Sequence, residues 1–141
     1  MQGGLTKAER VKKYGEVFTP AWVVSDMCDM LERENPNAFA TETTYLEPTC
    51  GDGAFVAEIL RRKFARCRSR RDYTVALRSL YAMEIQADNV EATIRRVEAQ
   101  CRALFKPTRE ELEIIRDHII QADSLKVMRM IGEMNGRSAE P

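Results

Sequence analysis

Apolar residues recur every three to four positions after Pro20, and the pattern ends at Asn35 and Pro36. This spacing predicts a helix that buries one face. Thr19 precedes the pattern and can cap free N–H groups, while Pro20 suits the first helical turn. Trp22 lies within the pattern, and we interpret it as a packing residue of this helix.

A strand, a glycine loop and another helix follow. Residues 43–47 are β-prone and end in an acid, Gly51 and Gly53 mark the loop, and residues 54–64 carry an apolar helical pattern. Seven basic side chains then crowd into residues 61–71. We interpret this basic cluster as a helix end that runs into a solvated loop, with phosphate binding as the alternative.

The second half of the chain repeats this alternation. A nearly continuous apolar run over 80–85 is typical of a parallel strand covered on both faces. Residues 88–105 have the spacing of an amphipathic helix, and residues 108–116 begin with the capping-box spacing of a short one. Residues 118–122 are predicted as a third strand, and residues 124–134 as the last helix.

The apolar stripe of the last predicted helix is interpreted as packing, and its members are Leu125, Met128 and Ile131. Strands that alternate with helices favour a parallel sheet with right-handed crossovers. The chain is therefore predicted to be an α/β protein, with a three-stranded parallel sheet flanked by helices and an additional helix before the first strand.

The length of 141 residues suits one domain. Residues 1–13 are polar and basic and are predicted to form a flexible arm, residues 14–135 the folded domain, and residues 136–141 a flexible tail. The apolar runs are well short of the roughly 18 residues that span a bilayer, and the first residues carry no signal-peptide pattern. We therefore expect a cytoplasmic protein without membrane contact.

Charge and cysteine content narrow the possible functions. The 22 basic residues balance the 22 acidic ones, so any contact with DNA is expected to be local or supplied by another chain. Four scattered cysteines without a CxxC pair and a single histidine leave too few well-spaced ligands for zinc. We expect neither a metal site nor a disulfide framework.

Acidic residues end the three predicted strands, at Glu47, Glu84 and Asp123. In an open parallel sheet, ligands bind beyond the carboxyl ends of the strands, so these acids are expected to line one crevice. Gly51 and Gly53 allow a tight turn, and the following helix offers N–H groups at its start. The arrangement favours a cationic or hydroxyl-rich ligand.

A dinucleotide is not favoured at this loop. The dinucleotide fingerprint needs a third glycine where this chain has Val56, and Asp52 would repel a pyrophosphate. NAD and FAD are therefore disfavoured.

Four segments resemble a known family: GEVFTP at 15–20, LEPTCGDGAF at 46–55, YAMEI at 81–85 and QADSL at 121–125. They look like successive motifs of the S-adenosylmethionine (AdoMet) pocket of DNA methyltransferases. The position of GEVFTP resembles type I modification subunits and related adenine-N6 enzymes. The likeness covers roughly residues 14–125. It implies part of a class I Rossmann-like methyltransferase fold, AdoMet as the cofactor, and adenine-N6 methylation of DNA in a restriction-modification system.

The resemblance also implies a set of cofactor-binding residues: Thr19, Pro20, Glu47, Thr49, Cys50, Gly51, Gly53, Phe55, Glu84, Ile85, Asp123 and Ser124. Thr19, beside Pro20, would help to hold the methionine carboxylate. Glu47 would face the positively charged amino end across the backbone of residues 49–51. Glu84 would accept hydrogen bonds from the ribose hydroxyls.

The remaining implied roles concern the adenine end. Ile85 would pack on the adenine face, Asp123 would accept from the exocyclic amine with Ser124 beside it, and Phe55 would close the glycine loop.

Simpler roles stay open for the same residues. Glu47 and Glu84 could be strand-end acids satisfied by backbone donors, and Asp123 could cap the last helix. Phe55 and Ile85 could be plain core residues.

The catalytic segment of the family is missing from this sequence. In the family, an Asn or Asp followed by two prolines and an aromatic grips the flipped adenine. The five prolines of this chain are nowhere adjacent, so no catalytic residue is assigned. We expect the chain alone to be inactive, with catalysis and DNA contact supplied by a partner chain or a missing C-terminal region.

The first predicted strand would be left as an exposed edge. This favours self-association or a second subunit at that edge, unless the last segment folds back over it. The alternatives to a split or truncated DNA methyltransferase are a stand-alone or degenerate AdoMet-binding module with a regulatory or structural role, a fragment of a protein or RNA methyltransferase, and a structural partner that has lost the ligand.

Overall fold

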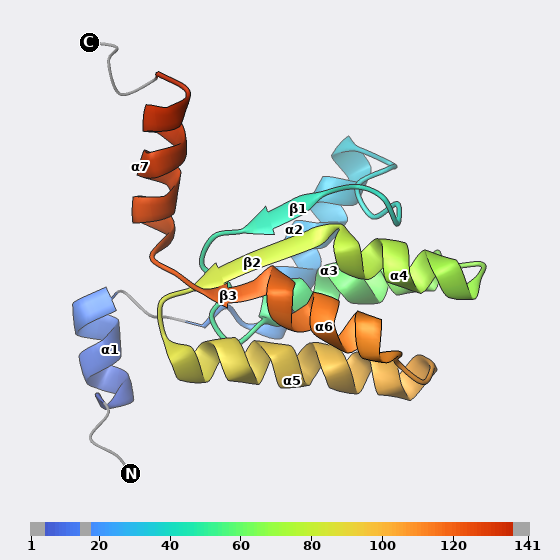
Figure 1. Ribbon diagram of the computed structural model, residues 1–141, viewed down its shortest axis with the longest axis horizontal. Helices are drawn as coiled ribbons and strands as arrows, with labels where there is room; N and C mark the ends of the chain where they lie inside the picture. The colour runs from blue at the N-terminus through green and yellow to red at the C-terminus, as the bar shows by residue number, and fades with distance from the viewer. Residues whose placement is uncertain (1–4, 15–17, 137–141) are drawn as a thin grey trace.

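The structure is a computed structural model, and it describes residues 5–14 and 18–136. Helices and strands alternate along most of this region (Figure 1). The elements are α1 (Lys7–Tyr14), α2 (Ala21–Glu34), β1 (Tyr45–Glu47), α3 (Ala54–Ala65), α4 (Arg70–Arg78), β2 (Leu80–Glu84), α5 (Ala87–Leu104), α6 (Arg109–His118), β3 (Ile119–Gln121) and α7 (Ser124–Met134).

The three strands form one open parallel sheet in the order β1-β2-β3. Tyr45 pairs with Leu80, and Ala82 pairs with Ile119. The predicted α/β class and three-stranded parallel sheet are confirmed. The first strand lies at an edge of the sheet, as expected.

One face of the sheet is covered. Residues paired across parallel strands point to the same face, and Leu80, Ala82 and Ile119 are buried there. They belong to one apolar core with buried side chains of α3 and α5, the two helices drawn below the sheet in Figure 1.

The other face of the sheet is covered only in part. Leu46, Tyr81 and Ile120 alternate with the buried positions, and they remain 47%, 45% and 43% exposed. Met83 shares this face, since it pairs with Ile120, and it is buried. The expectation that the middle strand is covered on both faces is therefore met at Met83 but not at Tyr81.

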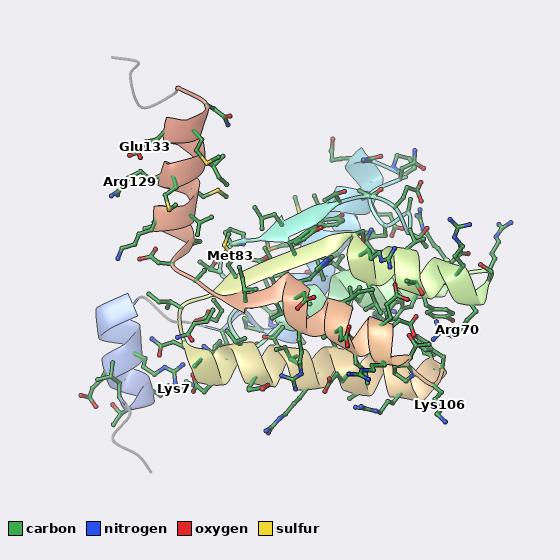
Figure 2. All side chains as sticks on the ribbon, in the orientation of Figure 1. Lys7, Arg70, Met83, Lys106, Arg129 and Glu133 are labelled. Atoms are coloured by element: carbon green, nitrogen blue, oxygen red, sulfur yellow. The ribbon has the colours of Figure 1, made fainter. Side chains whose placement is uncertain are left out.

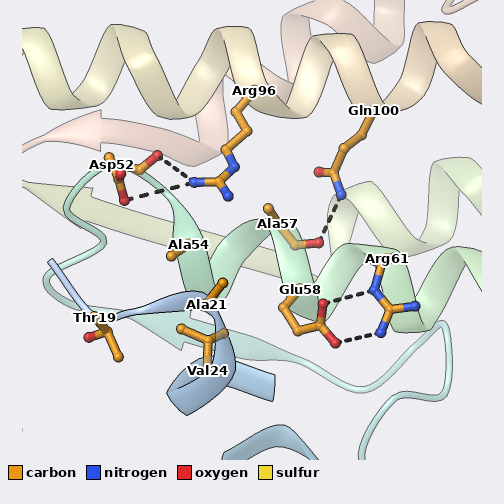
Figure 3. Close-up of a pocket in the computed structure, with 10 residues that line it drawn as sticks. All are labelled: Thr19, Ala21, Val24, Asp52, Ala54, Ala57, Glu58, Arg61, Arg96 and Gln100. Atoms are coloured by element: carbon orange, nitrogen blue, oxygen red, sulfur yellow. Dashed lines mark hydrogen bonds and ion pairs between the residues drawn. The ribbon is translucent and has the colours of Figure 1, made fainter. Parts of the chain in front are cut away.

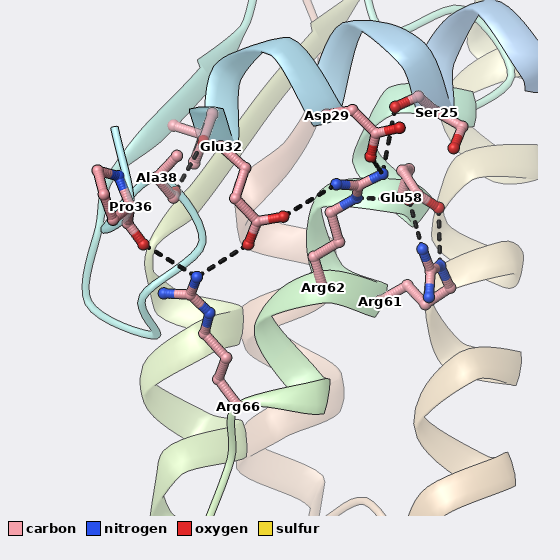
Figure 4. A network of polar contacts seen from close by, with 10 residues as sticks. Ser25, Asp29, Glu32, Pro36, Ala38, Glu58, Arg61, Arg62 and Arg66 are labelled. Atoms are coloured by element: carbon pink, nitrogen blue, oxygen red, sulfur yellow. Dashed lines mark hydrogen bonds and ion pairs between the residues drawn. The ribbon is translucent and has the colours of Figure 1, made fainter. Parts of the chain in front are cut away.

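Ion pairs attach α2 to α3. Arg62 of α3 donates to the carboxylates of Asp29 and Glu58 at 2.7 Å each and to Glu32 at 3.3 Å (Figure 4). Arg66 reaches the second oxygen of Glu32 at 2.9 Å. These contacts hold α2, which leads into the first strand, against the helix that follows the glycine loop.

Five of the seven basic residues at 61–71 are exposed, as predicted for a solvated face, and Arg62 and Lys63 are the exceptions. Lys63 is fully buried, and its Nζ donates to the carbonyl oxygens of Ala40, Thr41 and Thr43. An amphipathic side chain can cap a turn from inside in this way, and the charge count alone does not reveal it.

Helix α4 begins inside the same basic cluster and was not predicted. Ser69 and Asp72 form a capping box at its start, so Arg70 and Arg71 belong to a helix and not to a loop. The predicted capping box of α6, formed by Thr108 and Glu111, is confirmed.

Three other expectations need correction. Thr19 makes no capping hydrogen bond, because α2 begins after Pro20. Trp22 does not pack, and 70% of it is exposed. The stripe predicted to pack along α7 is exposed too, and no residue of α7 is buried, because the helix projects away from the sheet (Figure 1).

The predicted flexible arm and tail are described only in part. Helix α1 covers the second half of the expected arm and ends one residue beyond it, and its Arg10 forms an ion pair with Asp88 of α5 at 2.7 Å. Residues 1–4 of the arm and 137–141 of the predicted tail lie outside the described residues. Within the described ranges, every helix is too short or too polar to cross a membrane.

Candidate cofactor site

The glycine loop turns sharply above the carboxyl end of the middle strand. Gly51 has φ +55° and Gly53 has φ +90°, so both occupy the left-handed region that glycine tolerates best. The Cys50 amide donates to the carbonyl of Met83 at 2.9 Å, which fixes the loop to β2. The predicted tight turn is confirmed.

Thr93 of α5 supports the loop from below. Its hydroxyl lies 3.2 Å from the Gly51 carbonyl and 2.9 Å from the Asn89 carbonyl. A Cβ atom at Gly53 would lie only 2.9 Å from the Thr93 methyl group. Thr93 was not predicted as a site residue, because nothing in the spacing of α5 distinguishes it from other buried helix positions.

Glu84 ends the middle strand directly beneath this loop. One carboxylate oxygen accepts from the Gly51 amide at 3.1 Å, and the other accepts from the Gln86 amide at 2.7 Å. The side chain is only 7% exposed. The simpler role, an acid satisfied by backbone donors, is thus confirmed for Glu84. A carboxylate has about four acceptor positions, so acceptor capacity remains.

Glu47 ends the neighbouring strand and points to the same face of the sheet. It pairs with Ala82, two residues before Glu84, so Glu84 lies about 7 Å further along the sheet. Its carboxylate accepts from the Thr49 amide at 3.2 Å. Burial raises the pKa of Glu47, and the Thr49 amide partly opposes that rise. An unmatched, half-buried carboxylate favours a cationic partner.

Asp123 follows the third strand and caps α7. One of its oxygens accepts from the amides of Leu125 and Lys126 at 3.1 and 3.3 Å. The capping role considered from the sequence is confirmed, and Ser124 is the first residue of α7. The Ala122 amide donates to the Glu84 carbonyl at 3.1 Å, which joins this segment to the end of β2.

The three acids therefore lie at one edge of the sheet, each at the end of a neighbouring strand. Ile85 directly follows Glu84 and is 42% exposed, so its reading as a plain core residue is wrong. This edge offers carboxylate acceptors, an apolar side chain and the first amides of α3.

Phe55 packs partly against the core, as its simpler role predicts, and lines an apolar hollow of about 280 Å³ with Met27, Met30 and Leu31 of α2. Phe18 also lies at the glycine loop, where a Cβ atom at Gly51 would be 3.3 Å from the Phe18 ring. Phe18 was not predicted as a site residue, although it belongs to the GEVFTP segment.

Cys50 has no reactive environment. The side chain is buried beside Thr93, and burial raises the pKa of its thiol to about 11. A thiol of that pKa is overwhelmingly protonated at neutral pH, so Cys50 is a packing residue of the loop. Thr49, which precedes it, is exposed.

A larger cavity of about 410 Å³ lies between α2, α3 and α5 (Figure 3). Thr19 and Asp52 line it together with Arg96, whose guanidinium lies 3.5 Å from the Asp52 carbonyl. None of the three strand-end acids lines this cavity. The structure therefore places Thr19 in a cavity that the acids do not line.

Metal chemistry has no candidate centre in the described ranges, since no group of three His, Cys, Asp or Glu side chains is placed to hold an ion. Comparison of the chain with protein families, with curated proteins and with solved structures found no match in any of the three.

Proposed function

We propose that this chain forms the AdoMet-binding part of an adenine-N6 DNA methyltransferase with a Rossmann-like fold, and that the catalytic segment lies outside these 141 residues, in a partner chain or a C-terminal region. The observation that carries the proposal is the hydrogen bond from the Gly51 amide to the Glu84 carboxylate at the carboxyl edge of a parallel sheet. The resemblance of four ordered segments to AdoMet-pocket motifs supports the choice of ligand.

The chemistry of the edge suits AdoMet. Glu47 would pair with the amino group of the methionine moiety, because the carboxylate is half-buried and lacks a cationic partner among the contacts described. Glu84 would accept from the ribose hydroxyls, and Asp123 retains an oxygen that α7 does not use for the exocyclic amine. Ile85 would cover the adenine. When bound, the cofactor supplies an electrophilic methyl group.

Transfer of that methyl to adenine needs acceptors that grip a flipped base. This chain has no pair of adjacent prolines and thus no Asn-Pro-Pro-aromatic segment. In the proposed enzyme these residues hold the cofactor, and a partner chain or a C-terminal region holds the base and reads the DNA.

The test is calorimetric titration of the full chain with AdoMet. Glu84→Gln keeps the size of the side chain and one acceptor oxygen, and we expect it to weaken binding by about 1–3 kcal/mol. Glu113→Gln is the matched control, because Glu113 is exposed on α6 and contacts only Arg109 among the interactions described. Equal AdoMet affinity in wild type and Glu84→Gln, or no binding by the wild type, would refute the proposal.

A stand-alone AdoMet-binding module is the second candidate, and the missing proline pair is the observation that favours it. Both candidates require AdoMet binding, so a second assay separates them. The immobilised chain is used to bind partner proteins from an extract of the source cell. The resulting complex is then incubated with DNA and AdoMet. Formation of N6-methyladenine only in the presence of a captured chain that carries the missing segment supports the split enzyme. Binding of AdoMet without any such partner supports the module.

A further inference from the structure

We propose that two copies of this chain form a symmetric dimer in which α7 of each copy covers the bare sheet face of the other. This inference does not depend on the proposed function. It rests on two apolar surfaces of the same chain that lack a cover among the described residues.

The first surface, called the bare sheet face, is the exposed part of the second face of the sheet. It is formed by Leu46, Tyr81 and Ile120, one from each strand, whereas Met83 on the same face is buried. Parallel sheets are almost always covered on both faces, because their strands bury both sets of side chains. His118 stacks on the Tyr81 ring at 4.1 Å between centroids and shields only part of it. Water contact with this face is costly, and a cover is expected.

The second surface is α7. Its charged side chains Lys126, Arg129 and Glu133 follow one another at spacings of three and four residues and form one narrow polar stripe. Figure 2 shows Arg129 and Glu133 on the side of α7 that faces away from the sheet. The remaining circumference is largely apolar and exposed, and it includes Leu125, Met128, Met130, Ile131 and Met134.

An apolar arc of this width is more than a helix on a protein surface needs, and it is typical of a helix buried by a second surface. Methionine side chains, which are flexible and polarisable, adapt well to such a contact. The helix is about 16 Å long, and three strands about 4.8 Å apart present a face that it can cross.

The link between β3 and α7 determines which sheet α7 can cover. The link consists of Ala122 and Asp123. The Ala122 amide is bonded to the Glu84 carbonyl, which holds one end of the link on β2, and the Asp123 side chain caps α7 at the other end. This short link leaves little chain for α7 to fold back, and α7 projects from the sheet and does not lie across its own face (Figure 1).

A second copy offers the matching surface. Each chain carries one projecting apolar helix and one bare apolar face, so a twofold axis lets both contacts form at once. Exchange of a projecting terminal element between identical chains is a common route to such dimers.

The first experiment measures the mass of the full chain by light scattering after gel filtration. We expect twice the chain mass for the wild type. Ile131→Glu on α7 and Ile120→Glu on the sheet face should each raise the dimer dissociation constant by about a hundredfold or more, because each buries a charge in an apolar contact. Arg129→Glu on the polar stripe is the control and should remain dimeric.

A mixing experiment tests whether α7 of one copy binds the bare sheet face of another copy. In a mixture of Ile131→Glu and Ile120→Glu, the intact sheet face of the first variant can bind the intact α7 of the second. We expect a mixed dimer with one restored contact, although each variant alone is monomeric. Both substitutions replace exposed side chains, and circular dichroism with thermal unfolding should show that each variant is folded.

Three results would overturn the inference. A monomeric wild type at about 100 μM, well above most stable dimer dissociation constants, would exclude the dimer. Dimers that persist in both variants would place the contact elsewhere, for example at the β1 edge. Folded monomeric variants that fail to combine would show that α7 covers the sheet face within its own chain or that a different protein covers it.

Discussion

The Glu84 carboxylate accepts a hydrogen bond from the Gly51 amide at 3.1 Å, and this bond ties the glycine loop to the middle strand. The same carboxylate would face the ribose in the proposed complex. Glu84 thus has a structural role and a proposed binding role. Truncating its side chain would not separate these roles, because the Gly51 and Gln86 amides would also lose their acceptor. The glutamine variant disturbs the loop less than truncation, because it keeps an acceptor for one of the two amides, and thermal unfolding should accompany its titration to show that the loop remains folded.

We predict that Gly53→Ala destabilises the fold by about 2–4 kcal/mol. Two costs combine: a left-handed backbone at φ +90° costs an L residue about 1–2 kcal/mol, and the new Cβ would lie 2.9 Å from the Thr93 methyl group. Chemical denaturation monitored by circular dichroism measures the change.

Two further variants separate these costs. Gly136→Ala places a Cβ at φ +74° in open space, so it should cost at most about 1–2 kcal/mol. Thr93→Ser in the Gly53→Ala background removes the crowded methyl group and should recover part of the loss. A double-mutant cycle without coupling between positions 53 and 93 would contradict the steric explanation.

Much of the fold could be predicted because local patterns specify it. The Thr108 capping box, the glycine turn and the strand-end acids all depend on neighbouring residues, and the structure has each of them at the expected place. The predicted ends of the strands were less accurate. Strand β1 begins at Tyr45, two residues after its predicted start, and His118, the predicted start of the third strand, belongs to α6. Hydrogen bonding to a neighbouring strand determines where each strand begins and ends, and the sequence of one segment does not contain that information.

The errors share a physical cause, which is that tertiary contact determines whether a side chain is buried. Lys63 is part of a basic run, yet three carbonyls of a distant turn draw it into the core. Phe55 lines a hollow with α2, whereas Phe18 lies against Gly51. Neither outcome follows from the spacing of residues along the chain.

A second prediction concerns the ion pair between α4 and α6. Glu111 is 2% exposed and accepts from both Arg70 and Thr74, with Arg70 stacked on the Phe105 ring. The Arg70 hydrogen bonds lower the pKa of Glu111 from 4.5 to about 2, against the opposing effect of burial. We predict that Glu111→Gln destabilises the fold by about 1–3 kcal/mol at pH 7.

The pH dependence of this difference has a definite sign. A carboxyl whose pKa is lower in the folded state stabilises above its unfolded pKa and loses that contribution as pH falls. The difference in unfolding free energy between wild type and Glu111→Gln should therefore shrink as the pH falls from 4.5 to about 2. Glu113→Gln, at an exposed site on the same helix, should show almost no gap. A gap that stays constant over this range would contradict the assigned ion pair.

A third prediction concerns Lys63, the buried cation beneath the turn that precedes β1. Lys63→Met removes a buried charge, which is favourable, but it leaves the carbonyls of Ala40, Thr41 and Thr43 without their donor. Three unsatisfied acceptors outweigh the desolvation gain, so we expect a loss of about 1–3 kcal/mol. Lys106→Met at an exposed position is the control.

Hydrogen exchange locates the effect of this substitution. The amides of residues 40–45 should exchange faster in Lys63→Met, because the turn loses its central donor, while those of α5 should keep their protection. Uniform acceleration over the whole chain would indicate global loss of stability and would contradict a local role for Lys63.

The last prediction tests the proposed partner of Glu47 through pH. Burial raises the pKa of this carboxyl in the free protein, so protonation competes with a bound cation as the pH falls. A bound ammonium would favour the ionised form and lower the pKa, so AdoMet affinity should rise with pH up to the pKa of the free protein and then level off. Glu47→Gln should bind more weakly at pH 7 and lose this dependence. S-adenosylhomocysteine, which keeps the amino group but lacks the sulfonium charge, should show the same pH profile as AdoMet, because the amino end is the group that Glu47 is proposed to hold. A profile that survives in Glu47→Gln would assign the titration to another acid.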